Sequence, residues 1–178
     1  MLNKTEGSSN EVFNIINERL SYMEDVALFK AQRHLPIEDM ERENLVVNEA
    51  IISAQNSGLS LTHMESFIRA QISVAKAVQY RHRADFLSNT TQRKPRDLQK
   101  VVRPLLLHLN DKLIEQLVVY LKSYGSFNVD QYNEFEKAIN VKHVTISDKQ
   151  LIFRALQNVV MMPNDYSDKL TDDEPTDH

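Results

Sequence analysis

Two apolar stripes run side by side through residues 11–34, which read EVFNIINERLSYMEDVALFKAQRH. Steps of three and four residues join the apolar positions, which is the pattern of an amphipathic α-helix. Arg19 and Lys30 interrupt these stripes. Because eleven residues are three helical turns to within about 20°, both cations are expected on nearly the same side of one helix, roughly 16 Å apart.

Cations on an apolar stripe need an explanation, because buried Lys and Arg are rare unless they are paired. One interpretation is a structural partner or a side chain that reaches out to solvent. The other is an anion that is not part of the chain. Both interpretations remain open at this point. The candidate partners nearby are Glu24, Asp25, Glu38, Asp39, Glu41 and Glu43.

The composition favours an all-α fold and excludes several kinds of function. The chain has 178 residues with only 3 Gly and 5 Pro, so it has few of the residues that form the tight turns of β-hairpins. A net charge of −4 argues against general affinity for nucleic acid, and the lack of Cys excludes disulfides and thiolate chemistry. No apolar run approaches the roughly 18 residues of a membrane span, so no membrane association is expected.

Helix start and stop signals predict a bundle of about six helices, three long ones followed by a helical second half. Asn10 is a candidate N-cap, Pro36 a stop, Asp39 a second N-cap and Gly58 a second stop. We expect a polar tail (1–10), one domain (11–162, with halves 11–88 and 96–162) and an acidic disordered tail (163–178). The expected helices are 11–34, 39–56, 60–88, 97–124, 130–139 and 147–161.

Two further polar residues fall on inward faces of these helices. Gln79 lies four and seven residues beyond Ala75 and Ile72, and Arg103 lies three residues before Leu106. A buried amide that lacks a partner costs about 1 to 3 kcal/mol. Spacing therefore makes these cations and the amide candidates for one cavity in the bundle, and the structural interpretation remains open beside it.

Other chemical signals are weak. The six His residues are scattered without ligand spacing, so no metal site is expected. Basic clusters at residues 81–83 and 93–96 lack interleaved aromatic residues, which argues against nucleic-acid binding. The sequence also lacks a Gly-rich phosphate loop and a Ser-His-Asp ordering.

Five short motifs carry a resemblance to a known family. Together with Arg42 and Glu43, they cover about residues 11–88, and the likeness over 96–160 is looser. The motifs are NERLSYM (17–23), FKAQ (29–32), HLPIED (34–39), RAQ (69–71) and AVQY (77–80). With these motifs the sequence resembles the all-α chorismate mutases, specifically their exported, single-function γ class, and the resemblance implies an active site enclosed within one protomer.

This resemblance implies a role for each candidate residue. Arg19 and Arg103 are expected to hold substrate carboxylates, while Lys30 contacts a carboxylate and the ether oxygen, to which Gln79 also donates. The remaining residues are expected to line the site, with Glu43 meeting the ring hydroxyl, and Ala75 departs from the Ser or Thr that relatives often carry. These residues are Asp39 (through its backbone), Arg42, Glu43 and Ala75.

The resemblance further implies that chorismate is isomerised to prephenate without cofactor, nucleophile or metal. It also implies export to the periplasm or outside the cell and a homodimer. The N-terminus shows no apolar signal region, so the composition alone suits a mature exported protein and a cytosolic one equally. The alternative function is a non-enzymatic helical domain that senses a small dicarboxylate.

Overall fold

The computed structural model describes residues 8–89 and 91–163, and they form an all-α bundle, as expected. All six expected helices are present, the first of them divided at Tyr22. The expected acidic tail, from residue 164 onward, lies outside the described residues. The elements are α1 (Ser9–Ser21), α2 (Met23–Gln32), α3 (Met40–Asn56), α4 (Leu61–Ser88), the π-helical turn η1 (Leu98–Val102), α5 (Arg103–Tyr124), the 3-10 turn η2 (Val129–Gln131), α6 (Tyr132–Ala138) and α7 (Ile146–Gln157).

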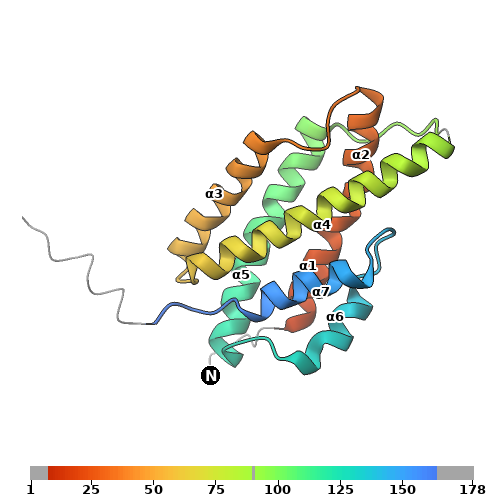
Figure 1. The fold of residues 1–178 in the computed structure, drawn as a ribbon. Coiled ribbons are helices and arrows are strands. Elements are labelled where there is room, and N and C mark those ends of the chain that lie inside the picture. The colour runs from red at the N-terminus through yellow and green to blue at the C-terminus, as the bar shows by residue number, and fades with distance from the viewer. Residues whose placement is uncertain (1–7, 90, 164–178) are drawn as a thin grey trace, which may run out of the picture.

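The longest helix, α4, crosses the molecule and connects its two parts (Figure 1). It packs against α2, α3 and α7. The α5 helix packs against α1 and α3, while α6 contacts α1 and α7. Five helices therefore surround one end of the bundle, and α6 and α7 cover the other.

An aromatic cluster anchors the start of α1 to the second half of the chain. Phe13 is fully buried and meets Phe135 of α6 edge-on, with ring centroids 5.2 Å apart. Phe127 and Phe153 lie against the same ring at 5.9 and 6.4 Å. Large buried aromatic rings dominate core energetics, so this cluster sets the direction in which α1 leads toward Arg19.

The first helical stretch ends two residues earlier than expected. Tyr22 interrupts it with a ψ of −11°, and α2 then ends at Gln32 rather than His34. His34 takes a left-handed φ of 54°, and the Leu35 backbone N–H donates to the Lys30 carbonyl at 2.8 Å. Such a bond closes the last turn in the manner of a Schellman cap. The helix therefore ends at this cap and not at Pro36, the stop expected from the sequence.

The fourth predicted helix also begins at a different residue than the sequence predicts. Asp97, expected as the first helical residue, is instead an N-cap whose side chain accepts from the N–H groups of Gln99 and Lys100. The turn that follows is π-helical, and α5 begins only at Arg103. Pro104 lacks an N–H group and cannot continue an α-helical ladder upstream, so the regular helix begins around it.

Two more boundaries shift in the second half. The sixth helix begins as the turn η2, and α7 ends at Gln157 rather than near Met161. Beyond α7 the chain runs beside the residues that precede α4: Ser60 N–H donates to the Val160 carbonyl at 2.9 Å, and Met162 N–H to the Gly58 carbonyl at 2.8 Å. These long-range bonds replace helical ones. No helix among residues 8–89 and 91–163 has the length and apolar character needed to cross a membrane.

The connection between α4 and η1 is fastened to α2 by a buried carboxylate. Asp25 is only 3 % exposed, and Arg93 Nη1 donates to its Oδ1 at 2.9 Å. Arg96 Nε donates to Oδ2 of the same carboxylate and stacks its guanidinium on the Tyr22 ring. A charge buried this deeply needs such partners, and they hold the connection against α2.

Candidate active site

All eight predicted site residues line one cavity at the end of the bundle formed by α1 to α5. Each of these five helices contributes, together with η1 and the segment before α3. The structure therefore brings together residues that lie up to 84 positions apart in the sequence, without a second chain. They are Arg19, Lys30, Asp39, Arg42, Glu43, Ala75, Gln79 and Arg103.

Arg19 projects from α1 into this cavity, and its side-chain partner among the described residues is neutral. Its Nη1 donates to Oδ1 of Asn110 on α5 at 2.8 Å. Burial lowers the pKa of Arg19 to about 10, so the guanidinium remains charged at neutral pH. The Asn110 amide orients this cation and leaves its charge uncompensated.

Lys30 on α2 is similarly placed. Its side chain is buried, and its Nζ donates to the Ile37 carbonyl at 2.7 Å. Burial lowers the pKa of Lys30, and the Asp39 carboxylate partly offsets this effect. Within residues 8–89 and 91–163, neither Lys30 nor Arg19 forms an ion pair with a carboxylate. The structural-partner explanation offered for these cations is therefore not supported within those residues.

One face of α4 supplies amide groups to the cavity. Gln71, Ala75 and Gln79 follow one another at four-residue intervals, and both Gln side chains are buried. Within residues 8–89 and 91–163, Gln79 Nε2 donates to the Met23 sulfur alone, at 3.5 Å. Gln79 Oε1 and Gln71 Nε2 find no hydrogen-bond partner among the described residues. Native proteins rarely leave buried polar groups unpaired, so these atoms are suited to meet a ligand.

The segment around the start of α3 carries the carboxylates. Asp39 caps α3, its Oδ1 accepting from the Arg42 backbone N–H at 3.0 Å. Its Oδ2 lies 3.6 Å from Arg103 Nη2, while Arg103 Nη1 donates to Gln99 at 2.7 Å. Burial lowers the pKa of Arg103, and the neighbouring charge of Arg42 lowers it further. Arg103 therefore reaches the cavity despite Pro104.

Glu43 is partly neutralised by a residue the sequence did not single out. Lys76 on α4 donates to Glu43 Oε2 at 3.1 Å and to Glu38 Oε2 at 2.8 Å. The hydrogen bond to Glu38 raises the pKa of Lys76 despite partial burial. Glu43 Oε1 is buried and unpaired among the described residues, so it can accept from a ligand hydroxyl.

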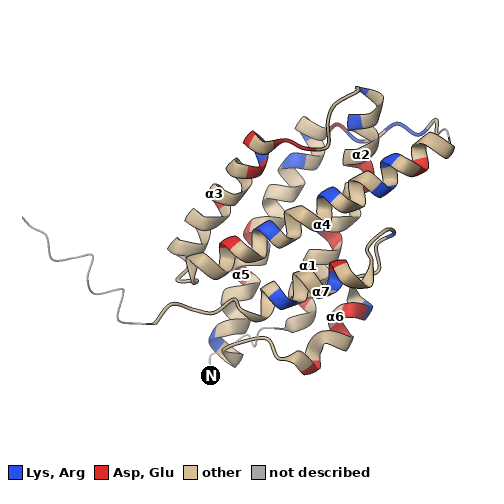
Figure 2. Cartoon of the chain, viewed as in Figure 1, with Lys and Arg blue, Asp and Glu red and all other residues tan. Residues whose placement is uncertain are grey.

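The cavity has a net positive lining that matches a small dianion. Five cationic side chains face three carboxylates, the cations being Arg19, Lys30, Arg42, Lys76 and Arg103 and the acids Asp39, Glu43 and Glu49. Charged positions on α2, at the start of α3 and at the start of α5 lie at the same end of the bundle, and α5 carries others further along (Figure 2). In a cavity of low dielectric constant, a net positive lining attracts an anion more strongly than the same charges would in water.

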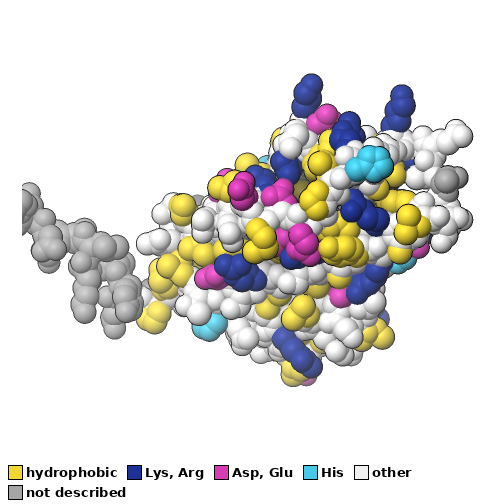
Figure 3. Space-filling view, turned by 45° about the horizontal axis from the view of Figure 1, so that its top comes forward, with side chains coloured by type: hydrophobic (Ala, Val, Ile, Leu, Met, Phe, Trp, Pro, Cys, Tyr) yellow, Lys and Arg dark blue, Asp and Glu magenta, His cyan; other side chains and the backbone are white. Residues whose placement is uncertain are grey.

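The charges on the face shown in Figure 3 are not arranged for a polyanion, because Lys and Arg side chains are interspersed there with acidic and hydrophobic ones. A nucleic-acid backbone rewards a continuous basic surface.

Sequence reasoning did not assign a site role to Gln71, Lys76 or Asn110, which all line the cavity. Gln71 lies eight residues before Gln79 and Asn110 seven after Arg103, so helical spacing could have found both. Lys76 carried no such signal, because a Lys between apolar positions normally faces solvent.

Comparisons with known proteins agree with this arrangement. The sequence model of the chorismate mutase type II family matches residues 5–80. The chain is 40% identical over 148 residues to a secreted chorismate mutase of Yersinia pestis, covering 82% of this chain and 78% of that one. It is 33% identical over 153 residues to a monofunctional chorismate mutase of Enterobacter agglomerans, covering 85% and 83%.

Solved structures show the same fold. The crystal structure of the secreted chorismate mutase from Yersinia pestis matches with a TM-score of 0.79 at 37% identity, over 85% of this chain and 97% of that one. A chorismate mutase from Burkholderia thailandensis matches with a TM-score of 0.68 at 22% identity, over 83% and 95%, which shows likeness of fold alone.

Proposed function

Because the chain belongs to the chorismate mutase family, we propose that it isomerises chorismate to prephenate in the cavity between α1 and α5. The observation that carries this proposal is the pair of buried cations, Arg19 and Lys30, which have neutral partners among the described residues. Chorismate is a dianion, and its two carboxylates would supply the missing negative charge.

The reaction explains why the cavity needs these residue types. It is an intramolecular Claisen rearrangement, in which a C–O bond breaks as a C–C bond forms within one molecule. The protein has to hold the substrate in its compact reactive conformation and stabilise the charge that grows on the ether oxygen. Fixed cations and amide donors perform both tasks without a nucleophile.

We assign the ether oxygen to Lys30 and Gln79. Lys30 Nζ uses one donor on the Ile37 carbonyl and keeps two others for the substrate. The Gln79 amide lies in the same cavity and makes one long contact to sulfur. A preorganised donor at a developing oxyanion is worth about 3 to 4 kcal/mol of transition-state stabilisation.

The two carboxylates of the substrate fit the arginines on opposite helices. Arg19 of α1 is oriented by Asn110, and Arg103 at the start of α5 is held by Gln99. Lys30 also contacts one of the two substrate carboxylates. A bidentate guanidinium fixes the orientation of a carboxylate as well as its position.

The residues at the start of α3 complete the proposed pocket. Asp39, through its backbone, and Arg42 line its wall, and Glu43 Oε1 accepts from the ring hydroxyl. Ala75 has no hydroxyl group, so it cannot make the contact to a substrate carboxylate that a Ser or Thr at this position would make. Gln71, one turn before Ala75, offers the unpaired Nε2 in its place.

The test is to mix the purified protein with chorismate, follow the loss of its ultraviolet absorbance and identify the product. Loss of absorbance with prephenate formation supports the enzyme. The alternative, a non-enzymatic sensor of a small dicarboxylate, predicts saturable calorimetric binding of chorismate without its consumption. Absence of both turnover and binding contradicts both functions.

We further propose that the protein is exported and forms a homodimer. The similarity to a protein of Yersinia pestis named as secreted supports export. The family resemblance supports the homodimer, and all eight predicted site residues line the cavity within one protomer. Cell fractionation tests export, and light scattering coupled to size-exclusion chromatography tests the dimer.

A further inference from the structure

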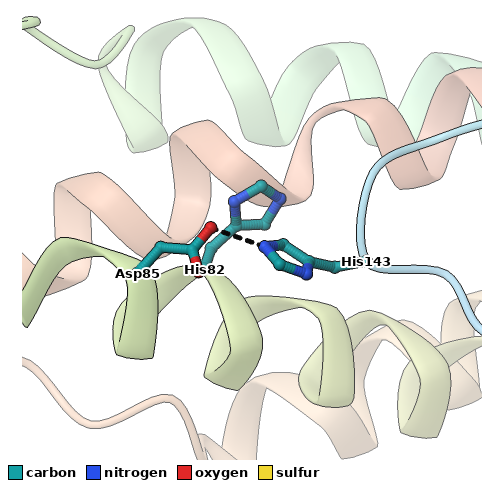
Figure 4. Close-up of side chains that lie close together, drawn as sticks. All are labelled: His82, Asp85 and His143. Carbon is teal, nitrogen blue, oxygen red and sulfur yellow. Dashed lines mark hydrogen bonds and ion pairs between the residues drawn. The ribbon is translucent and has the colours of Figure 1, made fainter. Parts of the chain in front are cut away.

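His82, Asp85 and His143 form a cluster outside the cavity (Figure 4). His82 and Asp85 lie one turn apart near the end of α4, and His143 lies in the turn before α7. One possible ligand atom from each residue lies within 4.8 Å of the other two. We propose that these three side chains bind a divalent transition-metal ion of the Zn²⁺ type.

The set of donor atoms suits such an ion. Zn²⁺ binds imidazole nitrogen and carboxylate oxygen at about 2.0 to 2.2 Å, which places tetrahedral ligand atoms about 3.3 Å apart. His143 Nε2 and Asp85 Oδ2 are 2.7 Å apart, and the two imidazole rings meet edge-on with centroids 4.7 Å apart. Small side-chain rotations therefore bring three ligands around one ion and leave a fourth position for water.

The neighbouring residues hold His143 in position. Its backbone takes a left-handed φ of 70°, which is uncommon for a side chain of this size. Arg81 Nη1 donates to the His143 carbonyl at 2.7 Å and to Asp148 Oδ2 at 2.5 Å. The turn is thereby fixed to α4 by a contact independent of the cluster, which presents the imidazole to His82 and Asp85.

When no metal is bound, the Lys142 ammonium group supplies the positive charge beside Asp85. Its Nζ donates to Asp85 Oδ2 at 2.8 Å, while its side chain is 70 % exposed. The ammonium group can therefore swing into solvent and free the carboxylate oxygen. Removal of Lys142 should increase metal affinity, an effect that a purely structural ion pair does not produce.

The test is calorimetric titration of the chelator-treated, full-length protein with Zn²⁺ at neutral pH. We expect one ion per chain, weakened about tenfold or more by His143→Asn and Asp85→Asn and tightened by Lys142→Gln. His143→Asn suits the left-handed turn, because Asn tolerates that conformation. The matched control is His63→Asn, which removes an exposed imidazole at the other end of α4.

Visible absorption with Co²⁺ in place of Zn²⁺ supplies a second readout, since imidazole coordination changes the cobalt spectrum and a surface ion pair does not. Circular dichroism checks that each variant is folded. The proposal is overturned if the protein binds no Zn²⁺ up to about 1 mM, or if His143→Asn and His63→Asn bind it equally. Turnover of chorismate should not depend on the metal, because none of the three ligands lines the cavity.

Discussion

At the scale of single residues, the candidate site contains two buried cations that form no ion pair with a carboxylate among the described residues. Arg19 and Lys30 each donate a hydrogen bond to one uncharged oxygen, and burying a cation in this way lowers the free energy of unfolding of the ligand-free protein. Residues of this kind are retained when a ligand completes them. Their removal should therefore reduce function far more than it reduces folding.

Lys30→Ala should remove most chorismate turnover and leave the fold intact. We expect kcat/KM to fall by about 10²- to 10³-fold, because one preorganised donor to the ether oxygen is lost. Steady-state kinetics measures the loss, with the exposed Lys94→Ala as control. Near-normal turnover in a folded Lys30→Ala protein would contradict the role assigned to Lys30.

Gln79 predicts a flat pH profile. An amide donates at any pH, so activity should vary little between about pH 5 and 8, whereas Gln79→Glu has to be protonated to donate. The variant should lose activity progressively as pH rises through the pKa of the new carboxyl group. Identical pH profiles of kcat for the two proteins would exclude Gln79 from the ether oxygen.

Gln71→Leu should separate binding from stability. The substitution removes a buried Nε2 that has no partner among the described residues, so unfolding by urea should occur at an equal or higher concentration. KM for chorismate should rise, because that amide is assigned to the substrate. An unchanged KM would mean that Gln71 only fills space beside Ala75.

At the scale of the elements, helices begin and end where local signals meet tertiary contacts. The cap at Asp39 acts as its sequence predicts, whereas the predicted cap Asn10 lies inside α1, which begins at Ser9. The end of α7 also differs from its prediction, because residues 160 and 162 exchange hydrogen bonds with the segment before α4. Local propensity is overridden where backbone groups find long-range partners.

The connection between α4 and η1 depends on the buried Asp25. The double variant Arg93→Ala/Arg96→Ala leaves this carboxylate unpaired and should lower the free energy of unfolding by about 3 to 5 kcal/mol. Urea denaturation measures the change. Lys94→Ala, in the same connection, should leave the unfolding midpoint unaltered, and equal midpoints for all three proteins would show that Asp25 does not fasten this segment.

At the scale of the whole molecule, contacts between α4 and the turn before α7 join the two halves. Burial alone would raise the pKa of Asp148, but hydrogen bonds from Arg81 and Thr145 outweigh it and lower that pKa. The folded state therefore binds the proton less tightly than the unfolded chain, so this carboxylate stabilises the fold above its unfolded pKa of about 3.9.

Stability should consequently fall as pH decreases below about 4, the ordinary pKa of a free aspartate. Asp85, whose pKa is lowered to about 2, contributes in the same direction at the same junction. Thermal unfolding between pH 6 and 2 measures the slope. Arg81→Met should flatten it, because the variant removes a main cause of the lowered pKa of Asp148, and an unaltered slope would place the acid sensitivity elsewhere.

The candidate site was largely predictable because helical periodicity is a local property. Spacing of three and four residues placed Arg19, Lys30 and Gln79 on inward faces, and the resemblance supplied the substrate. Lys76 and the cluster of His82, Asp85 and His143 had no such signal. Their geometry depends on segments up to 61 residues apart in the sequence, which spacing along one helix cannot relate.

The amino-acid sequence thus determined the helices, their inward faces and the presence of cations that lack an obvious partner, because these features follow from the repeat of a single helix. Only the tertiary structure decided that Arg19 meets Asn110, that Lys30 meets a carbonyl, and that His143 reaches α4. The physical reason is that crossing positions of helices depend on packing between distant segments, which no local pattern encodes.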